Sequence, residues 1–386
     1  MSAGTSSAGG SAEALRRQTP EILIAGGGTG GHTSPGLAVA ALLAERGVGC
    51  TWIGSRAGIE ARRAPEAGIP YRAIPTGKLR RAVTWRNVVD LAVGVPAGAA
   101  VAFFALGLIR PRIVLATGGY VAVPVMVAAA ARGIPIVLHE QTSVPGLASR
   151  LGARLARRVA VTFAESARHF PARKVVVTGN PLRPELRGGS PARAAERWAL
   201  DPAVPLVYVT GGAQGAQRVN RVVGAALAAL TAQAQVVHQC GDSPATGDRA
   251  WLEARRTELP PALARRYTIV PYVGPELADI YATAALVVSR AGAGTVNECC
   301  QLGLPALYIP LPGTRGDEQT VNARLVERAG GAIVLPQAEL VPERLVALVK
   351  ALLADPRRLK EMGERARRLA VPDAAERLVA LLTATR

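Results

Sequence analysis

The chain has 386 residues, a formal net charge of +18, 49% hydrophobic residues and only 4% aromatic ones. This length predicts two domains, and the hydrophobic content excludes a chain that is disordered throughout. The charge would suit a nucleic-acid-binding protein, but no aromatic side chains are interleaved with the arginines to stack on bases, so nucleic acid is not expected as a partner. Residues 1–19 are rich in Ser, Gly and Ala, and we expect a disordered tail.

The positive charge is concentrated in the first half of the chain. Residues 1–183 hold 22 Lys and Arg against 8 Asp and Glu, whereas residues 184–386 hold 24 against 20. A basic first half suits an anionic membrane surface or a phosphorylated partner.

The first element is a short apolar run, residues 22–25, that enters a glycine cluster. Gly26, Gly28 and Gly31 fit G-x-G-x-x-G, the phosphate-binding turn of dinucleotide folds. Such folds also require an acidic residue at the end of the second strand, where this chain ends the predicted strand with Arg56 instead. An NADP-dependent reductase with Arg56 at the 2′-phosphate is therefore weakened but remains an alternative.

His32 directly follows these glycines, where its imidazole can project beyond the sheet. A histidine needs little tuning to act as a general base near neutral pH, so His32 is a candidate base or oxyanion partner. A structural histidine at a helix start is the alternative.

Residues 91–109 form an uncharged run of 19, close to the length of a membrane span. The run contains several glycines and Pro96, and it lies between two predicted strands of one sheet. We therefore expect one or two partly buried helices here, either with an apolar face at a membrane surface or simply buried within the fold.

Two further turns of the first half carry polar residues at predicted strand ends. Tyr120 lies in "TGGYVAVP" and suits an acceptor hydroxyl or phosphate, or simple packing. His139, Glu140, Gln141 and Thr142 follow one another at the end of the next strand, which is the ligand-binding edge of an α/β sheet. One of the four is expected to cap the following helix.

Short β-branched runs alternate with alanine- and leucine-rich helices along the whole chain, which predicts an α/β fold with parallel sheets. Gly-Ile-Pro or Gly-Leu-Pro at residues 68, 133 and 303 predicts the end of a helix followed by a strand. "ILIAGGGTGG" at residue 22 recurs in form as "VYVTGGAQGA" at residue 207, so each half begins its own βαβ unit. Two Rossmann-like domains would then face each other across a cleft.

The predicted domain boundaries follow from the proline-rich passage "VTGNPLRPEL" at residues 177–186. We expect a first domain at residues 20–183 and a second at residues 184–368. Residues 369–386 form the last segment, in which a separate amphipathic helix is predicted after Pro372. We expect this helix to cross back onto the first domain.

The strongest site candidate of the second half is "VVSRAGAGTVNECC", residues 287–300. Residues 292–295 predict a helix start whose N–H groups can cradle a diphosphate, and Glu298 one turn later can hold ribose hydroxyls. Asp317, Gln319 and Asn322 suit sugar hydroxyls, although Asp317 is also a candidate helix cap. No D-x-D occurs, so neither a cofactor nor an anchored metal is expected; a divalent cation such as Mg²⁺ stays open.

Seven motifs occur in the order typical of one family: "GGGTGGHTSPGLA", "GGYVAVP", "LHEQT", "GNPLR", "GGAQGA", "SRAGAGTVNE" and "DEQTVNA". Residues 20–380 therefore resemble the MurG family of peptidoglycan N-acetylglucosaminyltransferases. The resemblance implies a GT-B fold with the donor in the C-terminal domain and the acceptor in the N-terminal domain. It implies inverting transfer of GlcNAc from UDP-GlcNAc to the C4 hydroxyl of the lipid-linked muramoyl-pentapeptide, which converts lipid I to lipid II.

The resemblance also implies roles for individual residues. His32 is the preferred base and Glu140 its rival, Val273 would offer backbone groups to uracil, and Gln319 would hold GlcNAc hydroxyls. The donor-binding residues would be Thr29, Gly30, Gly31, Thr142, Arg183, Ala213, Val273, Ala293, Gly294, Thr295, Val296, Asn297, Glu298 and Gln319. The acceptor-binding residues would be Gly30, Gly31, His32, Tyr120 and Gln141.

The chain departs from the family at two positions. Thr142 stands where the family commonly has Asn, so the donor and acceptor of an amide are replaced by one hydroxyl. Ala213 stands where the family commonly has Ser, so this position has no side-chain donor. The partners implied are UDP-GlcNAc, lipid I, the anionic inner leaflet and other cell-wall synthesis proteins. The implied location is peripheral, on the cytoplasmic face of the cell membrane, docked through residues 79–104 and the basic first domain. A catalytically inactive sugar-nucleotide-binding scaffold is a third alternative.

Overall fold

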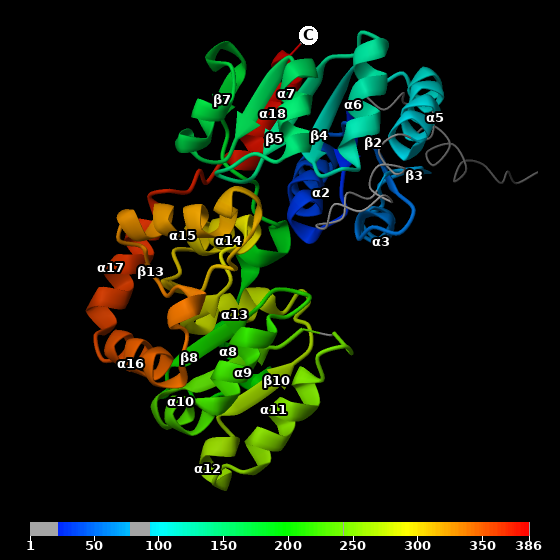
Figure 1. Cartoon of the computed structure of the whole chain (residues 1–386). Coiled ribbons are helices and arrows are strands. Elements are labelled where there is room, and N and C mark those ends of the chain that lie inside the picture. The colour runs from blue at the N-terminus through cyan, green and yellow to red at the C-terminus, as the bar shows by residue number, and fades with distance from the viewer. Residues whose placement is uncertain (1–21, 78–92, 242, 386) are drawn as a thin grey trace, which may run out of the picture.

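The computed structural model describes residues 22–77, 93–241 and 243–385 (Figure 1). Within them the chain forms two α/β units, each built on one parallel sheet, which confirms the predicted fold class. The expected tail, residues 1–19, and most of the expected membrane-docking segment, residues 79–92, lie outside the described residues.

The first sheet has seven parallel strands in the order β3-β2-β1-β4-β5-β6-β7. Its strands are β1 (Ile22–Gly26), β2 (Cys50–Ser55), β3 (Tyr71–Ile74), β4 (Ile113–Gly118), β5 (Ile136–Glu140), β6 (Arg158–Val161) and β7 (Val175–Val177). The helices of this unit are α2 (Gly30–Glu45), α3 (Glu60–Glu66), α5 (Val95–Ile109), α6 (Ala122–Ala131), α7 (Leu147–Leu155), η2 (Ala164–His169) and η3 (Ala172–Lys174).

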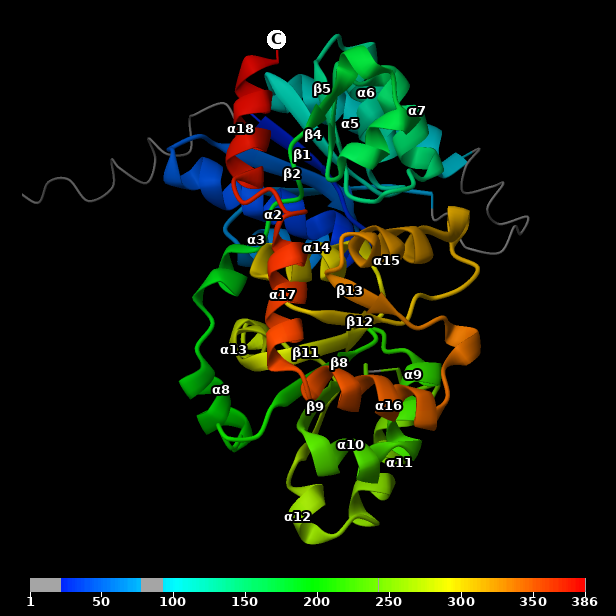
Figure 2. The same cartoon turned by 90° about the vertical axis from the view of Figure 1, so that its left-hand side faces the viewer.

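Both faces of the first sheet are covered, which explains why its strands are apolar runs rather than alternating patterns. Leu23 and Ala25 of β1 pack on one side with residues of α5 and α6. Ile22 and Ile24 pack on the other side with residues of α2. Leu378 of the last helix, α18 (Ala374–Ala384), is buried in this second cluster, and Figure 2 shows α18 lying beside the first sheet.

The second sheet has six parallel strands in the order β10-β9-β8-β11-β12-β13. Its strands are β8 (Leu206–Thr210), β9 (Gln235–Gln239), β10 (Tyr267–Val270), β11 (Ala284–Ser289), β12 (Ala306–Tyr308) and β13 (Ala332–Val334). Its helices are η4 (Pro184–Gly188), α8 (Pro191–Trp198), α9 (Gln217–Ala225), α10 (Leu227–Gln233), α11 (Asp248–Thr257), α12 (Pro261–Ala264), α13 (Leu277–Thr283), α14 (Ala293–Leu302), η5 (Arg315–Asp317), α15 (Glu318–Arg328), η6 (Gln337–Glu339), α16 (Pro342–Leu353) and α17 (Pro356–Arg367).

Three glycines end helices as the Gly-x-Pro pattern predicts. Gly68, Gly133 and Gly303 have φ of +73°, +68° and +68°, and strands β3, β5 and β12 begin three residues later. Glycine adopts this left-handed conformation without steric cost, so the chain leaves the helix there and enters the sheet.

Helix α5 occupies most of the long apolar run. It has 15 residues, and Val101, Phe104 and Leu108 are exposed while Ala102 and Leu106 are buried. Of the helices in the described part of the chain, none has the length and apolar content needed to cross a bilayer.

The two units meet through contacts that join residues far apart in sequence. The Asn297 side-chain amide of α14 donates to the Asn180 carbonyl at 3.0 Å, and the Gln301 amide donates to the same carbonyl at 3.2 Å. The Ser143 N–H donates to Asn322 Oδ1 of α15 at 3.2 Å. These contacts bring the start of α14 close to the start of α2 (Figure 1).

Candidate active site

A cavity of about 230 Å³ lies between the two units at the carboxyl ends of their strands. Parallel sheets bind ligands at this edge, where strands stop and helices begin. The cavity is lined by Gly30, Gly31, Ser34, Ile59, Asn180, Pro181, Arg183, Tyr208, Thr210, Gly212, Ala213, Gln239, Tyr272, Val273, Leu277, Tyr281, Gly294, Thr295, Asn297 and Glu298.

The start of α14 forms one wall. Its cap residue, Gly292, has extended backbone and supplies no side-chain cap, so the first N–H groups of the helix have no internal acceptor from it. A methyl group added at Gly292 or Gly294 would meet no atom within 4 Å. An uncapped helix start with open space before it is suited to an anion, which is the role that the glycine pattern predicts.

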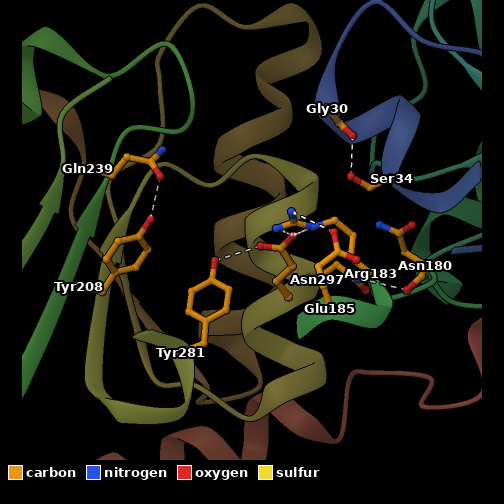
Figure 3. Close-up of polar contacts among 10 residues, drawn as sticks. Gly30, Ser34, Asn180, Arg183, Glu185, Tyr208, Gln239, Tyr281 and Asn297 are labelled. Atoms are coloured by element: carbon orange, nitrogen blue, oxygen red, sulfur yellow. Dashed lines mark hydrogen bonds and ion pairs between the residues drawn. The ribbon is translucent and has the colours of Figure 1, made fainter. Parts of the chain in front are cut away.

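Glu298 lies on the same helix and is held from two sides (Figure 3). The Arg183 guanidinium donates to Oε1 through Nη2 at 3.0 Å and Nε at 3.2 Å, and the Tyr281 hydroxyl donates to Oε2 at 3.0 Å. Oε1 already accepts two bonds, whereas Oε2 accepts one and keeps a second lone pair, so Glu298 can still accept a bond from a hydroxyl in the cavity through Oε2.

Gln239 organises the part of the cavity near Val273. Its Oε1 accepts the Val273 N–H at 3.1 Å and the Tyr208 hydroxyl at 3.2 Å (Figure 3). Because the Val273 N–H is already bonded to Gln239, the Val273 carbonyl is the backbone group left to contact a nucleobase. In the adjacent loop, the Thr210 hydroxyl accepts the Gly212 N–H at 2.9 Å.

The start of α2 forms the opposite wall. Gly30 and Gly31 line the cavity, and a methyl group added at Gly30 would meet no atom within 4 Å. The cap residue Thr29 is exposed, with no side-chain cap bond. The Ser34 hydroxyl donates to the Gly30 carbonyl at 2.8 Å (Figure 3).

His32 lies on the sheet side of α2, outside the residues that line the cavity. Its Nδ1 is 3.2 Å from the Thr117 carbonyl oxygen, which also accepts the Gln141 amide at 2.9 Å. Gln141 Nε2 also lies 3.4 Å from Nδ1. Because a carbonyl oxygen only accepts, the shorter contact with Thr117 favours the tautomer with the proton on Nδ1 and the lone pair on Nε2. Burial lowers the pKa of His32, and the charge of Glu140 opposes that shift.

Glu140 ends β5 and is 3% exposed. Its Oε1 accepts the Thr142 N–H at 2.9 Å and the Thr142 hydroxyl at 2.8 Å. Its Oε2 has no hydrogen-bond partner within the described residues. The Thr142 side chain therefore orients Glu140. The expectation that one of the four polar residues caps the next helix is wrong, because the cap residue of α7 is Gly146, with no side-chain cap bond.

The cavity brings together nine of the residues that the sequence singles out: Gly30, Gly31, Arg183, Ala213, Val273, Gly294, Thr295, Asn297 and Glu298. The others lie outside its lining: Thr29, His32, Tyr120, Glu140, Gln141, Thr142, Ala293, Val296 and Gln319. The Val296 side chain is fully buried in a core cluster, and Gln319 Oε1 accepts the Leu311 N–H at 2.9 Å. Among the described residues, no three His, Cys, Asp or Glu side chains group as metal ligands.

Among the lining residues that the sequence does not single out, Gln239 and Tyr281 make contacts that hold other lining residues in place. Gln239 is a polar residue at the carboxyl end of β9, and a polar residue at this end of a parallel strand is a recognisable signal of a ligand-binding edge. Tyr281 lies within α13 and reaches Glu298 across the fold, so nothing in its local sequence indicates the contact.

Comparisons with known proteins match both units. Residues 22–161 match the glycosyltransferase family 28 N-terminal domain, and residues 206–378 match the family's C-terminal domain. The UDP-N-acetylglucosamine–N-acetylmuramyl-(pentapeptide) pyrophosphoryl-undecaprenol N-acetylglucosamine transferase of a Nocardioides species is 42% identical over 372 residues, covering 94% of this chain and 97% of that protein. The same enzyme of Halorhodospira halophila is 42% identical over 369 residues, covering 93% and 97%.

Solved structures agree with this assignment. The crystal structure of Acinetobacter baumannii MurG superposes with a TM-score of 0.71 at 28% identity, covering 94% of this chain and 98% of that one. The calicheamicin glycosyltransferase CalG4 superposes with a TM-score of 0.67 at 19% identity, which supports the shared fold alone. The two facing sheets are therefore a GT-B fold, and the chain belongs to glycosyltransferase family 28 and, within it, to the MurG family of N-acetylglucosaminyltransferases.

Proposed function

We propose that the protein transfers GlcNAc from UDP-GlcNAc to the C4 hydroxyl of the lipid-linked muramoyl-pentapeptide, making lipid II from lipid I with inversion at the sugar. The observation that carries this proposal is the cavity in which two uncapped helix starts, those of α2 and α14, face each other. One helix start serves the diphosphate of the donor, and the other serves the acceptor. Residues 184–368 then form the donor domain and residues 20–183 the acceptor domain.

On the donor side, the diphosphate binds the N–H groups and the Thr295 hydroxyl at the start of α14. Glu298 accepts a bond from a ribose hydroxyl through Oε2, with Arg183 and Tyr281 fixing its carboxylate. The Val273 carbonyl accepts the N3–H of uracil. Gln319 contacts the GlcNAc hydroxyls once the domains close.

On the acceptor side, His32 is the proposed base. Nδ1 donates to the Thr117 carbonyl, so Nε2 takes the proton of the C4 hydroxyl as its oxygen bonds to C1 of GlcNAc. The bond from C1 to the UDP oxygen breaks, and the charge that develops on UDP is stabilised by the helix start. Glu140 is the rival base, since its Oε2 has no partner within the described residues.

The protein docks peripherally on the anionic inner leaflet, at the cytoplasmic face of the membrane. The exposed Val101, Phe104 and Leu108 of α5 form the apolar part of this contact. The net charge of residues 1–183 supplies the electrostatic part, so raised salt should weaken binding to anionic vesicles. Other cell-wall synthesis proteins are proposed partners at this surface.

The test is release of UDP from UDP-GlcNAc with and without a soluble lipid I analogue. UDP release that depends on the analogue supports the transferase. No UDP release, whether the analogue is present or absent, supports the scaffold alternative. Calorimetry with UDP-GlcNAc and with NADPH separates the transferase from a reductase, and binding of NADPH alone would contradict the proposal.

Two variants assign the donor contact. Glu298→Gln removes the charge that accepts from Arg183, Tyr281 and the ribose, so kcat/KM for UDP-GlcNAc should fall about 100-fold. Glu185→Gln is the control, because Glu185 also pairs with Arg183, at 3.8 Å, but does not line the cavity. Equal losses in both variants would mean that Arg183 positioning, and not the Glu298 contact, matters.

The base is assigned by His32→Ala, which should lower kcat about 100-fold. His169→Ala is the control, because His169 is a half-buried histidine of the same domain that does not line the cavity. Near-normal turnover of His32→Ala together with loss in Glu140→Gln would transfer the assignment to Glu140.

A further inference from the structure

The glycine loop at residues 26–31 already binds a carboxylate, and this carboxylate is a side chain of the protein itself. Glu60, the first residue of α3, is fully buried, and its carboxylate points into the loop. Its Oε2 accepts the Gly28 N–H at 2.8 Å. Its Oε1 accepts the Ser55 N–H at 3.0 Å and the Ser55 hydroxyl at 2.6 Å.

The glycines around this carboxylate leave room for it. A methyl group added at Gly27 would lie 2.1 Å from Glu60 Cδ, and one added at Gly58 would lie 2.2 Å from Oε1. One added at Gly54 would lie 2.7 Å from Cγ. Glycine is therefore required at Gly27 by the internal carboxylate, whatever ligand the loop serves.

The contacts of Glu60 are those of an ionised carboxylate. All three partners are donors, all three are neutral, and both oxygens accept, so no proton is needed on either oxygen. The charge acts on its neighbours: burial raises the pKa of Tyr71 and of Tyr120, and the nearby Glu60 charge raises both pKa values further. Tyr120 packs directly on the loop, since a methyl group added at Gly28 would lie 2.9 Å from its ring.

A buried negative charge changes what the loop can bind. In a dinucleotide fold the loop N–H groups receive the pyrophosphate and an acid at the end of the second strand receives the ribose. Here the carboxylate comes from α3, next to that strand end, and turns inward onto the Gly28 N–H. A phosphate placed at Gly27 or Gly28 would find its donor occupied and a like charge beside it.

We propose that Glu60 is a positioning and specificity residue, which holds the Gly27–Gly28 part of the loop with its own carboxylate and confines substrate anions to Gly30 and Gly31. This inference rests on the proposed function only in assigning the Gly30 wall to the acceptor. Glu60 acts through the loop backbone and does not itself touch substrate.

Two substitutions separate the charge from the geometry. Glu60→Gln keeps the size of the side chain but removes the charge and replaces one oxygen by an amide nitrogen, which donates. Either the Gly28 N–H or the Ser55 N–H then loses its acceptor. Glu60→Asp keeps the charge but shortens the reach by one methylene. Glu66→Gln is the control, because Glu66 lies on the same helix with its side chain 52% exposed.

The expected result is a split between kinetic constants. In Glu60→Gln, kcat should fall about tenfold without a rise in the acceptor KM, because the acceptor binds in unproductive positions as well. The Kd for UDP-GlcNAc should stay within about twofold, since the donor binds the other domain. Inorganic pyrophosphate should bind Glu60→Gln about fivefold more tightly than the wild type, measured by calorimetry, because a like charge has been removed.

Glu60→Asp should lose kcat but keep wild-type pyrophosphate binding. Unchanged pyrophosphate binding in Glu60→Gln, or an equal change in Glu66→Gln, would overturn the proposed confinement of anions. Should Glu60→Gln fail to fold, wild-type kcat in Glu60→Asp would overturn the positioning role. The pyrophosphate measurement needs no turnover, so it reports on Glu60 even if the transferase assay fails.

Discussion

Two helix starts in this protein follow the same sequence pattern and differ in what occupies them. At the start of α2, the Gly28 N–H is taken by the buried Glu60 carboxylate and only Gly30 and Gly31 reach the cavity. At the start of α14, open space lies before Gly292 and Gly294. A glycine-rich turn therefore indicates a phosphate site only where the protein has not supplied its own acceptor, and the two loops should respond differently to the same substitution.

The largest expected effect is that of Gly27→Ala on stability. The added methyl group would overlap the Glu60 carboxyl carbon at 2.1 Å, and the φ of +149° at Gly27 is one that alanine rarely adopts. Both Glu60 and the backbone are fixed by burial, so the free energy of unfolding should fall by more than about 3 kcal/mol. Chemical denaturation measures this loss.

Gly30→Ala is the control for that prediction, because it adds the same methyl group to the same loop where no atom lies within 4 Å. It should leave the unfolding midpoint nearly unchanged. Equal losses in the two variants would show that the loop backbone, rather than the internal carboxylate, demands glycine.

A smaller effect is expected at the contact between the two domains, where Glu318 begins α15. Burial and the Glu140 charge raise the pKa of Glu318 from 4.5 to about 7. The native state therefore binds this proton more tightly than the unfolded chain, and its free energy of unfolding falls as the pH rises from 4.5 to about 7. Glu318→Gln should remove that fall and gain about 2 kcal/mol above pH 7.

Denaturation curves across pH 4.5 to 8 test this prediction. Glu339→Gln, at an exposed glutamate of the same domain, serves as the control. A difference between Glu318→Gln and the wild type that does not vary with pH would show that the pKa of Glu318 is not raised in the folded protein.

The sequence predicts most of this fold because its signals are local. The apolar strands, the Gly-x-Pro helix ends and the glycine turn at residues 292–295 each depend on a few neighbouring residues, and the structure confirms the α/β class and the parallel sheets. The resemblance to the MurG family, carried by seven motifs, is confirmed by the relatives. The contacts within the site are harder to predict from the sequence, because each joins residues that are far apart along the chain.

Particular residues show where local reasoning ends. Glu60 reaches Gly28 across 32 positions, and no pattern in either segment indicates the bond. The protonated nitrogen of His32 is set by Thr117, 85 positions away. Asn297 was expected to bind the donor, but its side-chain amide donates to the Asn180 carbonyl, 117 positions away, and so joins the two units.

The smallest effect completes the comparison of the two loops. Gly294→Ala should leave stability unchanged or slightly raised, because its methyl group meets no atom within 4 Å and alanine favours helix. Gly294 lines the cavity, however, so the methyl group occupies the space proposed for the diphosphate.

The Kd for UDP-GlcNAc in Gly294→Ala should rise about tenfold, measured by calorimetry, since a ligand that must shift by a methyl radius loses alignment with the helix N–H groups. Gly146→Ala is the matched control, because Gly146 also begins a helix, α7, with open space before it, but does not line the cavity. A loss of stability without a change in Kd would place the diphosphate elsewhere. A change in Kd without a loss of stability is what an empty anion site requires, and it is the opposite of the result expected for Gly27→Ala, where the anion is already part of the fold.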